Sequence, residues 1–232
     1  MRHLCAVRMV GLALLWCIPL PLAFADSKRS QSLAEEAYYQ IEGNVFNRPV
    51  IEQAFAKLHQ ARRANPNDPW VYLTASLAVL VSGYQIGDWY TMRTFTEGTV
   101  AEALVLATKA VALGPSEGQC HAHLARLKII QGEYRAAWDM LTEAYKHNPD
   151  SFYPWYFRGI IAEKMRDVGQ GKSYFDEAEK RVAYAYQSSL INLHRQTLAK
   201  IAGDLAEQER LLKENIAKTL TDPMFMGTTR NS

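Results

Sequence analysis

A pattern that recurs every 34 residues is the feature that most constrains how this chain can fold. Two alanines seven residues apart, followed five residues later by a proline, occur twice in the same register. The two sets are Ala103, Ala110 and Pro115, and Ala137, Ala144 and Pro149. Small residues at this spacing share one face of a helix, which lets a second helix approach closely, and the proline ends the helix. The pattern predicts stacked helices joined by short turns, which is an all-α fold.

Further positions recur in the same register and identify the unit. The clearest copy, 118–151, has Leu124 and Ala125 in its first helix, Gly132 at the turn and Leu141 in its second helix. This arrangement resembles the tetratricopeptide repeat, a helix-turn-helix unit of about 34 residues. Other copies cover 35–68, with Tyr38, Ile41, Ala54, Ala61 and Pro66, and 152–185, with Trp155, Gly159, Phe175 and Ala178. His121 and Lys128 stand where the family usually has Trp and Tyr.

The resemblance covers roughly residues 35–220. It implies a right-handed superhelical array of antiparallel helix pairs, a solenoid of about four to five repeats. The last pair, 186–220, turns at Gly203 and has Gln208 and Asn215 in place of small residues, so we expect a degenerate, solvating cap. Residues 26–34 are expected to form a lead-in, and residues 221–232 a flexible tail.

The N-terminal segment, 1–25, has the composition of a signal peptide. Two arginines precede a 14-residue apolar run, and Ala23-Phe24-Ala25 offers small residues to a signal peptidase. We therefore expect cleavage before Asp26 and a periplasmic or secreted protein. The run is short for a membrane span and contains two prolines, so no transmembrane span is expected after cleavage. Trp16 before Cys17 disfavours a lipoprotein signal.

Removal of residues 1–25 changes both the charge and the cysteine content. The remaining chain has 24 basic and 24 acidic residues, a balance that gives no reason to expect nucleic-acid binding. Cys120 is then the only cysteine, so a disulfide within the chain is not possible.

One repeat is 15 residues too long, because Pro66 and Pro115 lie 49 residues apart. The excess is an insertion at 84–98, before Thr99 and Glu102, which are spaced as a capping box that restarts the helix. The insertion contains four aromatic residues: Tyr84, Trp89, Tyr90 and Phe95. Two interpretations stay open: a lid whose rings pack on the adjacent helices, or a functional segment on one face of the array.

The motifs that suggest catalysis or metal binding are incomplete. Gly169 to Ser173 ends like a phosphate-binding loop, but Arg166 stands where the first glycine belongs and no strand precedes it. Cys120, His121 and His123 cannot all share one side of a helix, and no other Cys or His has ligand spacing to them. We therefore expect no catalytic residues, no metal and no cofactor.

The predicted superhelix places the first helix of each pair on a concave face, which in this family binds extended peptides or a partner's helix. Ten residues are expected to line it: Trp70, Leu73, Leu77, His123, Arg126, Ile130, Tyr153, Tyr156, Phe157 and Ile160. This lining is apolar and aromatic with few charges, which suits an apolar segment of a partner. The alternative is that the chain's own C-terminal helices or the insertion fill the groove.

Two functional classes follow from these expectations. The first is a non-catalytic interaction module, an adaptor or chaperone that holds a protein or peptide in envelope assembly, secretion or maturation. The second is an enzyme or small-ligand-binding protein with a pocket under the insertion at 84–98. An open aromatic trough would favour the first, and a clustered Asp, Glu and His set in a deep pocket the second.

Overall fold

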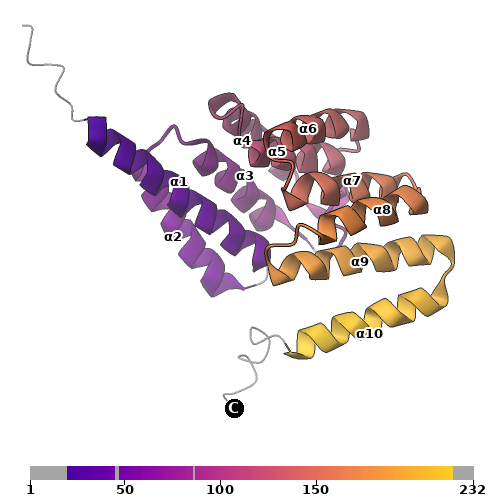
Figure 1. Cartoon of the computed structure of the whole chain (residues 1–232). Coiled ribbons are helices and arrows are strands. Elements are labelled where there is room, and N and C mark those ends of the chain that lie inside the picture. The colour runs from indigo at the N-terminus through magenta and orange to yellow at the C-terminus, as the bar shows by residue number, and fades with distance from the viewer. Residues whose placement is uncertain (1–19, 45–46, 86, 222–232) are drawn as a thin grey trace, which may run out of the picture.

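A computed structural model describes residues 20–44, 47–85 and 87–221. In these residues the chain forms ten α-helices and one short 3-10 helix, η1, and the helices lie in five antiparallel pairs (Figure 1). The helices are α1 (Leu20–Gly43), α2 (Arg48–Ala64), α3 (Pro69–Gly83), α4 (Thr99–Leu113), α5 (Gly118–Ile130), α6 (Tyr134–His147), α7 (Phe152–Lys164), α8 (Val168–Glu179), α9 (Ala185–Ala202) and α10 (Leu205–Thr221), with η1 at Met92–Thr94. The predicted all-α array of helix pairs is confirmed.

The helices pack in the order that the repeats predict. Each odd-numbered helix packs on the next even-numbered one, and the odd helices α1, α3, α5, α7 and α9 also contact one another along the array. Ala103, Ala110, Ala137 and Ala144 are fully buried. A Cβ atom on Gly118 would lie 2.8 Å from the carbonyl oxygen of Ala144, so these helices approach as closely as small residues allow.

Several helices begin at residues that accept a hydrogen bond from the first turn. Asp68 Oδ1 accepts from the backbone N–H of Trp70 at 2.9 Å, and Pro69 opens α3. The helix α4 begins at Thr99 as predicted, but the predicted capping box is wrong. Gly98 is the cap residue, and Thr99 Oγ1 lies 2.6 Å from Thr96 Oγ1 instead. Because Thr99 is already the first helical residue, its side chain cannot bond the N–H three residues ahead.

The turns between paired helices repeat with the same period as the alanines. Gly132, between α5 and α6, has a φ of 79°, and Arg166, 34 residues later between α7 and α8, has a φ of 61°. Both residues adopt the left-handed conformation that ends many helices. Arg166 is the one described residue other than glycine with a positive φ. The repeat therefore keeps its left-handed turn even at a position that has no glycine, the residue that adopts this conformation most easily.

The first helix extends beyond the first repeat. Residues 26–34, expected as a lead-in, belong to α1, and Ser30 Oγ donates a hydrogen bond to the carbonyl of Ala61 on α2 at 2.9 Å. Residues 1–19 of the predicted signal peptide and 222–232 of the predicted tail lie outside the described residues. Among the helices described, none has the length and apolar content needed to cross a membrane.

Candidate functional site in the concave face

All ten residues predicted to line the concave face are buried, but Ile130 lies in a second core cluster with Phe95 of the insertion, apart from the apolar groove residues of α3 and α7. Trp70, Leu73 and Leu77 lie on α3, and His123, Arg126 and Ile130 lie on α5. The four from α7 are Tyr153, Tyr156, Phe157 and Ile160. None of the ten is more than 5% exposed, because side chains from other parts of the chain cover them. Binding of a partner at these residues stays a prediction.

The helix α1 covers one part of this face through Tyr38. Its ring lies 5.9 Å from the Trp70 ring, 6.2 Å from the His123 ring and 6.5 Å from the Tyr153 ring, between centroids. The Tyr38 hydroxyl donates to Glu42 Oε1 at 3.0 Å and accepts from the side-chain amide of Gln119 at 3.1 Å. Tyr38 therefore occupies the surface between α3, α5 and α7.

A buried ion pair lies beside Tyr38. Arg126 of α5 pairs with Glu42 of α1, and each side chain is at least nine-tenths buried. Burial opposes the charged form of Arg126, but Glu42 and the nearby tyrosines raise its pKa well above the usual value, so the guanidinium stays cationic. Its guanidinium carbon lies 5.1 Å from the centre of the Phe157 ring. The pair therefore joins the first and third helix pairs across the concave side.

The insertion covers a second part of the face, through one of its four aromatic residues. The hydroxyl of Tyr90 donates to the hydroxyl of Tyr156 at 3.1 Å, and the neighbouring Asp88 forms an ion pair with Lys164 of α7. The other three rings pack together: Tyr84 stacks on Trp89 at 4.2 Å, and Phe95 lies 5.6 Å from Trp89. These three pack against α3, α4 and α5, where Phe95 shares a core cluster with Ile130, whereas Tyr90 contacts Tyr156 and Phe157 of α7.

The helix α9 closes the face from the C-terminal end. The hydroxyl oxygens of Tyr186 and Tyr153 lie 2.9 Å apart, and the rings of Tyr184 and Tyr39 lie 4.8 Å apart. Further along α9, His194 Nδ1 lies 2.7 Å from Glu163 Oε2 on α7. The first and last helix pairs therefore meet, and the concave side is an aromatic core rather than an open trough.

Four residues that the sequence analysis did not assign to this face complete the core: Tyr38, Glu42, Tyr186 and His194. One signal could have located Glu42. Arg126 is the one charged member of the ten predicted groove residues, and a buried arginine requires an acidic partner. The repeat itself could not have revealed these contacts, because it assigns residues to faces within a pair and does not fix how far the array curves.

Burial opposes ionisation of several tyrosines and one histidine in this core. Burial raises the pKa values of Tyr38, Tyr153 and Tyr156 well above their usual value, so their hydroxyls stay protonated. Burial, and secondarily Arg126, holds the pKa of His123 well below its usual value, so the imidazole is neutral.

The hydrogen bonds of His123 identify the proton-bearing nitrogen. Ser76 Oγ donates its single proton to the carbonyl of Ala103 at 2.7 Å and lies 2.9 Å from His123 Nε2. The Nε2 atom therefore carries the imidazole proton and donates to Ser76, and Nδ1 is a bare acceptor.

Three polar atoms of the predicted groove are buried without a hydrogen-bond partner among the described residues. They are Trp70 Nε1, His123 Nδ1 and Arg126 Nε. Two are donors and one is an acceptor. Buried polar groups are paired in most proteins, and each unpaired one costs free energy, so their presence on one surface is a feature to explain.

Residues near the rejected motifs are structural. Burial raises the pKa of the Cys120 thiol to about 12, which keeps it protonated and unreactive. His121 Nε2 lies 2.8 Å from the carbonyl oxygen of Pro115. Gly169 to Ser173 lies in the first turns of α8, and a helix, α7, precedes it. In the part of the chain that is described, no three His, Cys, Asp or Glu side chains converge as metal ligands do.

Comparison with known proteins gives matches in structure alone. No family model and no curated protein matches the sequence. A crystal structure of MamA protein has 13% identity over 90% of this chain and 98% of its own, with a TM-score of 0.44. A tetratricopeptide repeat protein from Parabacteroides merdae has 20% identity over 85% of this chain and 70% of its own, with a TM-score of 0.46.

A third structure supports the fold assignment. The APC/C hetero-tetramer Cut9–Hcn1 contains a chain with 15% identity and a TM-score of 0.56, which covers 87% of this chain. The match spans 38% of that longer chain. With the helix pairs and the 34-residue period described above, this likeness shows that the chain has the fold of a tetratricopeptide-repeat solenoid.

Proposed function

We propose that this protein is a non-catalytic interaction module, an adaptor or chaperone that binds an extended segment of a protein partner on its concave face. The observation that carries the proposal is the set of three unpaired atoms, Trp70 Nε1, His123 Nδ1 and Arg126 Nε, on an aromatic surface. An extended peptide presents N–H donors and C=O acceptors along its length, and could pair with such atoms while its side chains pack on the rings.

Binding at the concave face requires that the side chains covering it move. The part of the insertion that covers this face is small. Tyr90 has one side-chain hydrogen bond, to Tyr156, and its buried ring contacts Phe157 and His194. Asp88 forms an ion pair with Lys164. The rings of Tyr84, Trp89 and Phe95 can stay on α3 and α4 when Tyr90 swings away. A state with Tyr90 displaced would therefore keep most of the packing of the insertion.

The experiment compares two variants that each remove one hydroxyl group. Tyr90→Phe removes the bond to Tyr156, and Tyr145→Phe removes a hydroxyl from a tyrosine on α6 that is 38% exposed. A hydrogen bond contributes about 1 kcal/mol, so its loss should raise the population of the open state, and the apparent affinity for a partner, about fivefold. Affinity capture from envelope extracts, titrated with each variant, measures this change.

The proposal predicts that Tyr90→Phe binds the same partner more tightly than the unmodified protein, and that Tyr145→Phe binds it equally. Equal capture by all three proteins would contradict a concave site controlled by Tyr90. Capture of no protein by any of them would contradict the interaction function itself.

We further propose that the protein acts outside the cytoplasm, in envelope assembly, secretion or maturation. This rests on the charged start, the apolar run and the small residues before Asp26. Intact-mass measurement of the exported protein tests it. The expected product begins at Asp26, and a mass that retains residues 1–25 or includes a lipid would contradict it.

One observation favours the alternative of a small-ligand or catalytic site under the insertion. The buried pair of His194 and Glu163 lies next to Tyr90, whose ring centre is 5.6 Å from that of His194. The rings of Tyr156 and Phe175 also contact His194, so side chains fill the space in this conformation. We therefore favour the interaction module.

A further inference from the structure

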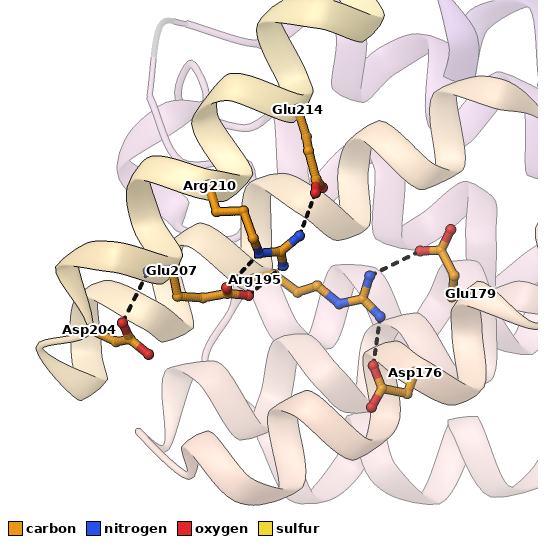
Figure 2. Close-up of polar contacts among 7 residues, drawn as sticks. All are labelled: Asp176, Glu179, Arg195, Asp204, Glu207, Arg210 and Glu214. Atoms are coloured by element: carbon orange, nitrogen blue, oxygen red, sulfur yellow. Dashed lines mark hydrogen bonds and ion pairs between the residues drawn. The ribbon is translucent and has the colours of Figure 1, made fainter.

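The last helix packs on α9 with Leu211 buried, and charged side chains lie beside that contact. On α10, Arg210 pairs with Glu207 at 2.6 Å and also with Glu214. Figure 2 shows these residues facing α9, where Arg195 binds Asp176 and Glu179 of α8. The hydrogen bonds from Arg210 lower the pKa of Glu207, and the charges of Lys172 on α8 and Arg195 on α9 add to this effect.

The opposite side of α10 is apolar and exposed. We call Leu205, Leu212 and Ile216 the outer stripe; they are 76%, 51% and 51% exposed. Their spacings of seven and four residues place them on one helix face. Glu214 lies two residues from both Leu212 and Ile216, which is about 200° around the helix. The outer stripe therefore points away from α9, although this pair was expected to be a solvating cap.

An exposed stripe at the end of a repeat array is the surface that a further repeat would cover. A second copy stacked head to tail would have to supply a matching apolar face from its own first pair. Among the residues of α1 and α2 whose exposure is described, no large apolar side chain is exposed. The outer stripe of another copy is itself an apolar face of matching length.

The charges beside the stripe suit that arrangement. Glu209 and Lys213 lie on one flank of the stripe, where they form an ion pair at 2.6 Å and are 67% and 73% exposed. When two α10 helices pack antiparallel about a two-fold axis, the same flank of each helix meets its counterpart. Glu209 of one copy then lies beside Lys213 of the other, twice in the dimer.

We propose that the protein forms a two-fold symmetric homodimer in which the outer stripes of two α10 helices pack antiparallel. The dimer surface lies at the end of the array, away from Trp70, His123 and Arg126. The dimer and the concave partner site are therefore independent, and either can fail without the other.

The first test is the association state in sedimentation equilibrium over about 1–100 μM protein, a range in which a specific dimer is detectable. The unmodified protein should be a dimer. Leu212→Glu should weaken dimerisation about tenfold or more, because it places a charge at the centre of the interface. The matched control is Val105→Glu on α4, which is 70% exposed and lies outside the stripe, and which should leave the dimer unchanged.

The second test uses the charge pair and identifies the antiparallel register. Glu209→Lys and Lys213→Glu should each weaken their own homodimer, because like charges then face each other across the axis. A mixture of the two variants should recover a heterodimer, because both contacts then join a lysine to a glutamate. Circular dichroism of each variant confirms that α10 is intact.

A monomeric protein throughout this range would overturn the proposal and assign the stripe to a different partner. A dimer unaffected by Leu212→Glu would also overturn it. Failure of the charge variants to recover dimerisation when mixed would contradict the antiparallel packing.

Discussion

The hydroxyl of Tyr90, in the insertion, donates a hydrogen bond to the hydroxyl of Tyr156, 66 residues later on α7. This contact links the insertion to the middle of the predicted groove, where both side chains are buried. Together with Tyr38 and Tyr186, it makes the inner side of the array a second core, beyond the core within each helix pair.

Replacement of Tyr156 should therefore reduce stability. Tyr156→Ala removes a ring that is 1% exposed and should lower the free energy of unfolding by about 3–5 kcal/mol, whereas Tyr156→Phe removes one hydrogen bond and should cost about 1 kcal/mol. Tyr145→Ala, at a half-exposed ring, should cost clearly less than Tyr156→Ala. Urea denaturation measures all three. A loss below about 1 kcal/mol for Tyr156→Ala would mean that the concave face is open in solution.

The two equivalent turn residues, Arg166 and Gly132, give two predictions in which stability changes in opposite directions. Arg166 has a φ of 61°, a conformation that costs a side-chain-bearing residue about 1 kcal/mol, so Arg166→Gly should leave stability unchanged or raise it by up to about 1 kcal/mol. Gly132→Ala, at the equivalent position with a φ of 79°, should lower stability by about 1 kcal/mol. No atom lies within 4 Å of the added methyl group, so the backbone alone decides the result. Thermal unfolding measures both, and the same sign for both variants would contradict the shared turn.

The low pKa of His123 predicts that the stability of the fold depends on pH. Burial holds the pKa of this imidazole well below its usual value in the folded protein, whereas the unfolded chain binds the proton near pH 6.5. The folded state therefore loses stability as the pH falls below about 6.5, by at most about 1.4 kcal/mol per pH unit for this one group.

The matched variant isolates this contribution from those of other groups. His123→Gln keeps a hydrogen-bonding side chain near Ser76 but has no group that titrates in this range. Between pH 7.5 and 5.5 the unmodified protein should lose about 1 kcal/mol more than the variant, measured by urea denaturation. Identical pH profiles would show that His123 is not buried as a neutral imidazole.

The sequence predicted the helix pairs well, because the signals that define them are local. Ala137 and Ala144 indicate close helix packing, and Gly132 indicates a left-handed turn. The excess length between Pro66 and Pro115 indicated the insertion. These features depend on residues within one or two helices. They therefore appear in the sequence with a fixed period.

The sequence left open whether the concave face is filled by the insertion and the C-terminal helices, because the answer depends on contacts between distant pairs. Tyr186 reaches Tyr153, and Glu42 reaches Arg126, only because the array curves until its ends meet. Curvature is the sum of small rotations at every pair, and no short motif records it. The insertion was likewise ambiguous, since three of its rings pack locally while Tyr90 and Asp88 contact α7.

The contact between the ends of the array gives the most direct test of the closed face. A Cβ atom added to Gly43 at the end of α1 would lie 3.2 Å from Cδ1 and 3.8 Å from Cγ of Tyr186 on α9. Because the Sγ of a cysteine takes roughly the place of the Tyr186 Cγ, we expect cysteines at these two positions to come within reach of a disulfide. The pair Gly43→Cys and Tyr186→Cys is introduced into residues 26–232 with Cys120→Ala, and the control pair is Gly43→Cys with Tyr145→Cys.

The measurement is intact mass after mild oxidation. The account predicts that the Gly43 and Tyr186 pair loses two hydrogens to form an internal disulfide in the folded monomer, and that the control pair keeps both thiols. Free thiols at both positions of the first pair would show that the ends of the array lie apart, and would contradict a concave face closed by the chain's own side chains.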